Sequence, residues 1–424
     1  GYYMNFDIFD EIDLLPKYKS ELINAAKVAE RNVLVSPYNT LLNARVSLEN
    51  LCKALIKSNH LEHVREDGSV NLTTMIETCT SNGVFTKKDE AHQIRLNGNK
   101  AAHLKAGAEH LHIVNAENVE IAMTSVKCLF AILAEIFPNQ ANGAEFDVNR
   151  VPFGFYEIVR AVPKSDNEVI FGDYNYFVKD PKENYYYFQV LHRNSESSIQ
   201  NDLGARSVLT GNRIKEDKKR TSYLLDVYYP SNLMAESDRD YIAYSVYSDS
   251  KLLAEVKSGV LDEKQVVQIA LDILNVLLEL KHIGNGIHLR NIQPGNVIIT
   301  PDGDDYMASV VNMETAKINN YDATVFASMK DLIVTNPFLP REVRQDSEGK
   351  STNWEKVDVY SVAVLMVYCV DRTAVKETID TDDLYDYFSD EVADILAEIF
   401  DSSLNEIDGV EELKEKLEDA LEEL

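Results

Sequence analysis

The chain has 424 residues, of which 45% are hydrophobic and 26% are charged, so it suits two or three folded domains and not a disordered protein. Its 70 acidic and 42 basic residues give a formal net charge of −28, which opposes binding to nucleic acid or anionic lipid unless a local basic patch prevails. Four widely spaced cysteines without a C-x-x-C pair disfavour a zinc site and a disulfide framework. We expect a reducing, cytoplasmic location, no metal or cofactor, and no membrane contact, because no apolar run reaches 18 residues and the N-terminus is not a secretory signal.

The first third of the chain has helical hydrophobic spacing. From residue 5 to residue 137, apolar side chains recur every three or four positions and no alternating pattern occurs, which predicts an all-α bundle of four or five helices. We divide this part into an N-terminal extension, residues 1–29, and a helical domain, residues 30–137. Residues 138–152 are polar and rich in turn formers, which predicts a linker.

The character of the sequence then changes. Residues 153–248 contain short runs of aromatic and β-branched residues separated by turn signals, which predicts an antiparallel sheet of about five strands. Helical spacing returns from Asp262, interrupted by strand-like segments at 296–300 and 307–311. The fold class we predict is therefore multidomain, an all-α N-terminal bundle followed by an α+β portion. The strands expected in residues 153–248 are Val169–Phe171, Tyr174–Val178, Tyr185–Leu191, Tyr223–Tyr229 and Tyr241–Tyr247.

The C-terminal end is strongly acidic. Residues 377–424 contain 19 acidic residues and two lysines, yet their apolar residues keep helical spacing. Such a charge run is typical of the solvated face of packed helices. Binding of a basic partner by these helices stays open at this point.

Several segments of the second half are similar to protein-kinase motifs. Residues 289–296 read Leu-Arg-Asn-Ile-Gln-Pro-Gly-Asn, against the kinase catalytic loop H-R-D-I-K-P-x-N. Residues 312–317 stand where kinases carry D-F-G-x-A-K, and residues 338–343 resemble Y-x-A-P-E-V. Residues 358–365 resemble D-V-Y-S-F-G-V-L, a buried helix of that family. The four segments occur in the family's order.

Residues 153–415 thus resemble a protein kinase. The resemblance implies a bilobal domain, with a small lobe at residues 153–248 and a large lobe at residues 249–424 that includes the acidic helices. It also implies structural roles for Glu342 and Asp358.

Phosphoryl transfer needs a base and charged groups that hold metal-bound phosphates. The resemblance places Asn291 at the catalytic base, Gln293 at the loop Lys, Asn312 at the Mg²⁺-binding Asp and Gln189 at the strand Lys. An amide accepts no proton and is a poor Mg²⁺ ligand, and Asn296 alone cannot hold the ion. With the glycine-rich loop also missing, we predict a pseudokinase without catalytic activity. Metal-free nucleotide binding and a residual kinase of unusual design are the alternatives.

The helical part resembles a second family. Residues 44–49 read A-R-x-x-L-E and residues 98–103 read G-N-x-A-A-H, and residues 30–137 resemble the HEPN superfamily (higher eukaryote and prokaryote nucleotide-binding domains) in the branch that carries both segments. The resemblance implies a homodimer, because many members are metal-independent ribonucleases whose two subunits form one composite R-x4–6-H site. Such nucleases are common in microbial toxin and antiviral defence systems.

The motif gives each candidate residue a role. A histidine can move the protons of RNA cleavage, and Arg or an amide can hold the scissile phosphate. Here His103 is the candidate acid or base, Asn99 the polar residue and Arg95 the phosphate ligand, with Glu49 and Lys53 as a supporting pair. The other basic residues of this stretch, which offer RNA a local positive surface, are Lys87, Lys88, Lys100 and Lys105, with His92 nearby.

Two departures bear on cleavage. Seven residues separate Arg95 from His103, one more than the motif's spacing, and Gly98 stands where the motif's Arg belongs. We therefore predict a HEPN-like effector regulated by a pseudokinase, either a ribonuclease or a binding protein, with RNA and a protein bound by the pseudokinase as candidate partners. The alternative is a non-catalytic scaffold in which both domains bind proteins.

Overall fold

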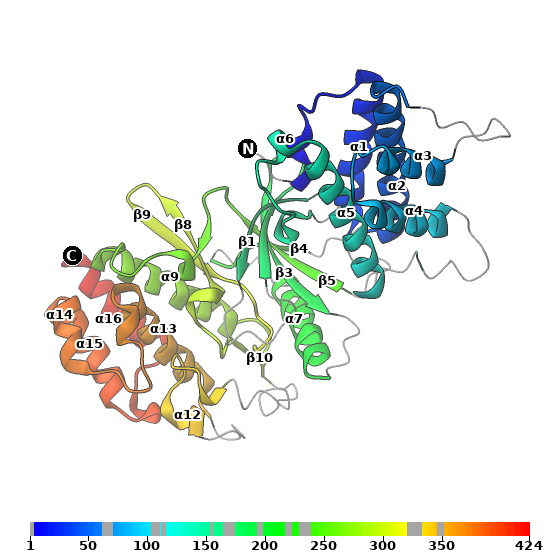
Figure 1. Ribbon diagram of the computed structural model, residues 1–424. Coiled ribbons are helices and arrows are strands. Elements are labelled where there is room, and N and C mark those ends of the chain that lie inside the picture. The colour runs from blue at the N-terminus through cyan, green and yellow to red at the C-terminus, as the bar shows by residue number, and fades with distance from the viewer. Residues whose placement is uncertain are drawn as a thin grey trace. The chain divides into compact units, whose positions relative to one another are not determined.

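The computed structural model describes residues 4–61, 71–102, 111, 116–152, 156–163, 174–192, 198–216, 223–228, 239–319, 333–345 and 352–424 (Figure 1). The chain forms two compact units. Unit 1 comprises Gly1–Val162, Tyr176–Asn184 and Pro230–Tyr241, and unit 2 comprises Pro163–Asn175, Tyr185–Tyr229 and Ile242–Leu424. None of the helices in the described ranges has the length and apolar character needed to cross a bilayer.

The N-terminal region of unit 1 is helical, as predicted. Proline begins α1 and α2 at positions where a helix needs no backbone N–H donor. In Figure 1 these helices run from blue to cyan. The helices are α1 (Pro16–Asn32), α2 (Pro37–Ser58), α3 (Leu72–Ser81), α4 (Lys88–Ala102) and α5 (Ala116–Ile136).

Helix α2 is the centre of this bundle, in contact with α1, α3, α4 and α5. Its apolar residues Ala44, Leu48, Leu51 and Leu55 are buried at helical spacing. Two buried hydroxyls tie it to α1: Thr40 Oγ1 donates to the Ala29 carbonyl over 2.7 Å, and Ser47 Oγ donates to the Leu22 carbonyl over 2.9 Å. The bundle therefore has a core with both apolar and satisfied polar contacts.

The segments expected as an extension and a linker also contact the bundle. Most of α1 falls within residues 1–29, and the short helix η1 (Asn5–Phe9) is bound to buried Glu30, which accepts from Asn5 N (3.0 Å), Asn5 Nδ2 (2.7 Å) and Phe6 N (3.1 Å). In residues 138–152, which include α6 (Pro138–Ala141) and η3 (Val148–Arg150), Asp147 N donates to Asn5 Oδ1 over 2.7 Å. The rings of Phe6 and Phe146 both contact Phe130.

A five-stranded sheet follows, in the order β1-β2-β3-β5-β4. The sequence did not predict a helix in this part: residues 198–216 form α7 (Ser198–Glu216), which lies between β3 and β4 in the chain and has Arg213 and Lys215 in its last turn. The expected strand Val169–Phe171 lies outside the described residues, and the first strand is an earlier segment. The strands are β1 (Glu157–Pro163), β2 (Tyr174–Lys179), β3 (Tyr185–His192), β4 (Val227–Tyr228) and β5 (Arg239–Val246).

The C-terminal part of unit 2 is mainly helical with a small sheet, as predicted. β8 (Val297–Asp302) pairs antiparallel with β9 (Asp305–Val310), and α9 (Glu263–Lys281) contacts β9 as well as helices α13 and α16. Asp262 caps α9, because its side chain accepts from Gln265 N over 2.8 Å. The other elements are β6 (Lys251–Leu252), η5 (Leu253–Glu255), β7 (Ile287–His288), η6 (Pro294–Asn296), β10 (Lys317–Ile318), α12 (Arg341–Gln345), α13 (Trp354–Val370), η7 (Arg372–Ala374), η8 (Thr381–Asp383), α14 (Leu384–Tyr387), α15 (Asp390–Asp401), η9 (Leu404–Glu406) and α16 (Val410–Glu422).

The acidic C-terminal helices have the predicted solvated face. In α16, Val410, Leu413, Leu417 and Ala420 are buried, whereas the acidic residues between them are exposed. Helix α13 differs, because buried residues surround most of its circumference. It therefore forms the interior of this part of unit 2.

Candidate functional site

The loop of residues 289–296 is held by one buried carboxylate. Asp358 on α13 accepts from Leu289 N and from Arg290 N, each over 2.9 Å. Burial raises the pKa of Asp358 to about 7, and the two backbone hydrogen bonds only partly oppose that shift. Arg290, whose φ is +62°, donates from Nε to the Thr315 carbonyl over 2.7 Å. These contacts fix the backbone on which the candidate residues of the loop stand.

A chain of neutral polar side chains lies beside this loop. Tyr187 and Gln189 lie two apart on β3 and therefore share one face of the strand. The hydroxyl of Tyr187 accepts from Asn175 Nδ2 over 2.8 Å and from Asn312 Nδ2 over 3.1 Å. Asn312 Nδ2 is also 2.9 Å from Asn296 Oδ1. All five side chains are buried, so this network fills the space between β3 and the segment after β9.

The remaining candidate positions extend the same network. Asn296 Nδ2 donates to the Asn291 carbonyl over 2.8 Å, and Gln293 Nε2 donates to Asn291 Oδ1 over 3.2 Å. Gln189 Nε2 donates to Glu314 Oε2 over 2.8 Å. Glu314 is thus a carboxylate whose oxygen already accepts from a protein amide, and it is 1% exposed.

The chemistry open to this network is limited. Its amides offer no proton acceptor for a substrate hydroxyl, because an amide nitrogen has no basic lone pair. No group of three His, Cys, Asp or Glu side chains placed to hold a metal occurs in the described part of the chain. Glu342, for which the resemblance implied a structural role, is exposed in the first turn of α12.

In the helical region, the two motif segments meet at Gly98. A Cβ added there would lie 2.5 Å from Arg45 Cβ, so only glycine allows α4 to approach α2 this closely. Arg45 Nε donates to Asn99 Oδ1 over 2.9 Å, and Arg45 Nη1 lies 3.6 Å from Glu49 Oε2. Lys53 Nζ is 3.3 Å from Glu49 Oε1. Asn99, Glu49 and Lys53 therefore belong to one polar chain with Arg45.

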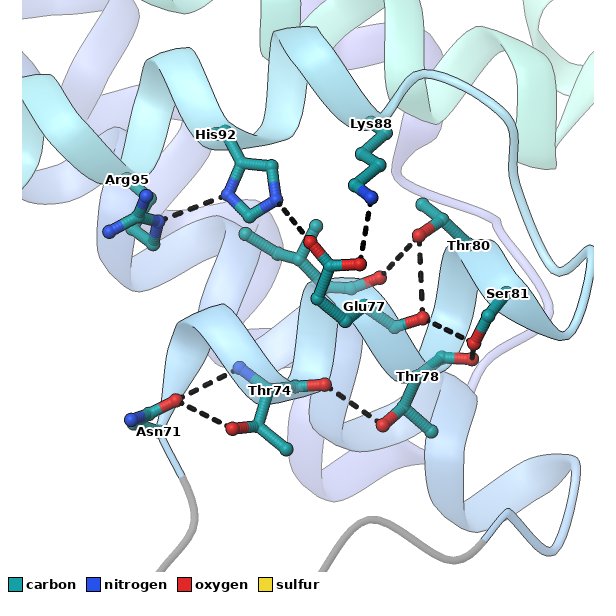
Figure 2. Close-up of polar contacts among 10 residues, drawn as sticks. Asn71, Thr74, Glu77, Thr78, Thr80, Ser81, Lys88, His92 and Arg95 are labelled. Carbon is teal, nitrogen blue, oxygen red and sulfur yellow. Dashed lines mark hydrogen bonds and ion pairs between the residues drawn. The ribbon is translucent and has the colours of Figure 1, made fainter.

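A second polar chain joins α3 to α4 (Figure 2). Glu77 Oε1 lies 3.0 Å from His92 Nε2, and Glu77 Oε2 lies 2.8 Å from Lys88 Nζ. Arg95 Nε donates to His92 Nδ1 over 3.1 Å, which assigns the ring proton to Nε2, facing Glu77. The hydrogen bonds from Lys88 and His92 lower the pKa of Glu77. Helix α3 itself begins at Asn71, whose side chain accepts from Thr74 N over 2.9 Å.

Arg95 and Asn99 lie on one face of α4 but bond to different partners. Arg95 contacts His92 toward α3, while Asn99 contacts Arg45 on α2. His103, the candidate acid or base, lies outside the described residues, as does Lys105. From the sequence, Arg45 and Glu77 had no site role, and Lys88 and His92 were placed only in a basic stretch open to RNA. A signal for the α4 residues was available, because 88, 92, 95 and 99 recur at steps of four, three and four, the spacing of one helical face.

No protein-family model matches the chain, and no curated protein matches it.

Proposed function

We propose that residues 153–415 form a protein-kinase-like domain that does not transfer phosphate, and that residues 30–137 form a HEPN-like domain that acts on RNA. The chain would then be a regulated RNA-directed effector, of the kind found in microbial toxin and antiviral systems. In this proposal the kinase-like domain binds a regulatory partner, and the helical domain pairs with a second copy to complete its site.

The observation that carries the first half is the buried neutral network. Tyr187 joins Asn175 to Asn312, and Gln189 bonds to Glu314, at the positions where the kinase resemblance would put nucleotide phosphates and their metal. A kinase site needs cationic and anionic groups there, aimed at a ligand. Here most of the side chains are neutral and hydrogen bond to one another, while Gln189 bonds to the carboxylate of Glu314. Among the described residues, Gln189 Oε1 and Asn312 Oδ1 have no hydrogen-bond partner. The hydrogen bonds from Leu289 N and Arg290 N to Asp358 support a loop held in one conformation, and in this proposal the amides on that loop cannot transfer phosphate.

The second half is supported by the meeting of the two motif segments. Arg45 lies over Gly98 and hydrogen bonds to Asn99, so α2, which carries A-R-x-x-L-E, is adjacent to α4, which carries residues 98–102 of the second segment. His103 follows Asn99 by four residues in sequence. In this proposal His103 takes the proton of a ribose 2′-hydroxyl as that oxygen bonds to the adjacent phosphorus. The protonated imidazole then gives the proton to the 5′-oxygen that leaves as its bond to phosphorus breaks, and Asn99 donates a hydrogen bond to the RNA backbone.

One observation favours the alternative of a non-catalytic scaffold. Arg45, the cation bonded to Asn99, is already paired with Glu49, and Glu49 also meets Lys53. Polar side chains that satisfy one another in this way are also what a purely structural helix–helix contact uses. On that reading the helical region pairs copies or partners, and RNA stays uncut.

One incubation with two readouts tests the proposal. The full chain is mixed with structured and unstructured RNA and with γ-labelled Mg-ATP, and RNA fragments and protein-bound label are both measured. We expect fragments from the wild type, none from His103→Ala, and no label transfer by either. Uncut RNA across conditions and candidate activators would favour the scaffold. Label transfer that is lost in Asn296→Ala would overturn the assignment of an inactive kinase.

A further inference from the structure

The polar side chains of α4 form a single stripe. Lys88, His92, Arg95 and Asn99 occupy successive positions on one face, and the Lys88–Asn99 interval spans about 16 Å at 1.5 Å per residue. None of the four is fully buried. The acidic residues in the first turn of α4, Asp89 and Glu90, do not share this spacing. We call these four residues the α4 stripe.

Arg95 is the cation of the stripe that no acid neutralises. Lys88 is paired with Glu77, and His92 gives its ring proton to the same carboxylate. In the described part of the chain, the partner of Arg95 is the neutral Nδ1 of His92, and no carboxylate lies within ion-pair distance of it. The group of Lys88, Glu77, His92 and Arg95 therefore carries one more positive than negative charge, in a chain whose net charge is −28.

The position of Arg95 is also fixed in advance. Glu77 holds the His92 ring in one tautomer, and that ring accepts from Arg95 Nε, so only the two terminal guanidinium nitrogens remain to contact a ligand (Figure 2). A guanidinium with two parallel N–H donors matches a phosphate group better than an ammonium does. Holding the side chain before binding also reduces the entropy lost when the ligand is bound.

We propose that the α4 stripe is a binding track for the backbone of single-stranded RNA, with Arg95 as its central phosphate contact. This rests on the proposed RNA-directed function and deepens it: the sequence already made Arg95 a candidate phosphate ligand, and the structure adds the His92–Glu77 pair that holds it and the stripe in which it lies. A track of this length suits a strand with several phosphates rather than one phosphorylated side chain. Asn99, whose Oδ1 accepts from Arg45, keeps its amide N–H donors for a ribose 2′-hydroxyl, the group that distinguishes RNA from DNA.

Binding of a fluorescent single-stranded RNA to the full chain tests the track. Anisotropy is measured at several salt concentrations at 4 °C, with RNA integrity checked on a gel. Arg95→Ala should weaken binding by about tenfold or more, because a charge-assisted bidentate contact is lost. The slope of log K against log salt should fall by about 0.7, the value for one phosphate contact on a single strand. Arg95→Lys should keep the slope and lose part of the affinity.

Arg31→Ala is the matched control, since Arg31 is an exposed arginine at the end of α1. It should leave both affinity and slope near wild type. The proposal is overturned if Arg95→Ala binds like wild type, if Arg31→Ala costs as much, if single-stranded DNA of the same sequence binds as tightly, or if the wild type binds no RNA. If Arg95→Ala still cleaves RNA, the proposal that the α4 stripe binds the RNA backbone is rejected, while the proposed RNA-directed function is not. Loss of cleavage in every chain, including the wild type, would count against the function itself.

Discussion

Two carboxyl groups, one in each unit, are buried with their pKa values raised to about 7. Glu30 holds η1 through three donors, and Asp358 holds the loop at Leu289 and Arg290. In both cases burial is the largest cause of the shift, and the hydrogen bonds oppose it. Each group therefore stabilises a fixed backbone segment while disfavouring its own charged form.

The raised pKa values of Glu30 and Asp358 predict how the free energy of unfolding depends on pH. The ordinary values are 4.5 for Glu30 and 3.8 for Asp358, so between about pH 4 and pH 7 the folded state binds more protons than the unfolded state. The free energy of unfolding should then fall as pH rises through this window and level off above it. Urea unfolding followed by circular dichroism from pH 5.5 to 8.5 measures the slope. Asp358→Asn and Glu30→Gln should each flatten it, although each variant also loses a hydrogen bond.

Glu391→Gln serves as the comparison, because Glu391 is exposed on α15. For this variant, the slope of the free energy of unfolding against pH should equal that of the wild type. An unchanged slope in both Asp358→Asn and Glu30→Gln would contradict the argument, since the pH dependence would then come from other groups.

The contact between α2 and α4 depends on the absence of a side chain at one position. An alanine Cβ at position 98 would lie 2.5 Å from Arg45 Cβ and 2.8 Å from Arg45 Cδ. Because Arg45 Cβ is fixed to α2, the two helices must separate to admit it. Gly98→Ala should therefore destabilise the chain by about 1–3 kcal/mol, the usual cost of overpacking, even though alanine favours a helix interior by about 1 kcal/mol.

Thermal and urea unfolding of Gly98→Ala measure this cost. Gln93→Ala, at an exposed position of the same helix, should change stability by no more than about 0.5 kcal/mol. A Gly98→Ala variant as stable as the wild type would show that the helices tolerate a wider separation.

The elements that sequence spacing predicted are those with a clear apolar face. The N-terminal helices, β8, β9 and the amphipathic α16 follow that rule. Helix α7 was missed because it lies between strands rich in aromatic residues, and its own apolar residues are few. The close approach at Gly98 could not be predicted, since it depends on which helix faces α4 and not on the glycine alone.

The candidate sites divide in the same way. The sequence shows that Gln189, Asn291 and Asn312 carry no charge. It does not show that Tyr187 joins Asn175 to Asn312, because Tyr187 has no assigned role until its hydroxyl is placed beside Asn312. The contact between Glu77 on α3 and His92 on α4 could not be predicted either, because it depends on how the two helices pack.

At the scale of the whole molecule, the net negative charge lowers the stability of the folded chain, whereas ion pairs raise it. The net charge of −28 makes the folded chain repel itself, most strongly where acidic residues are dense, as in α15 and α16. Ion pairs such as Lys416 with Asp408 are solvent-accessible and contribute little. Raising NaCl from 0.05 to 0.5 M should therefore raise the melting temperature by a few degrees, because the Debye length, about 10 Å at 0.1 M, shortens with salt and screens the repulsion between charges farther apart than that length.

If the α4 stripe binds single-stranded RNA as proposed, the same salt series should weaken that binding. Each contact between a cation of the stripe and a phosphate releases counterions, and this release is less favourable at high salt. Measuring melting and RNA anisotropy on identical samples separates the two effects, and choline chloride in place of NaCl controls for specific binding of sodium. As the salt concentration rises, we expect the melting temperature to rise and the affinity for RNA to fall. A melting temperature that falls with salt would mean that ion pairs outweigh the net repulsion, and a binding affinity that does not fall would mean that the RNA contact is not electrostatic.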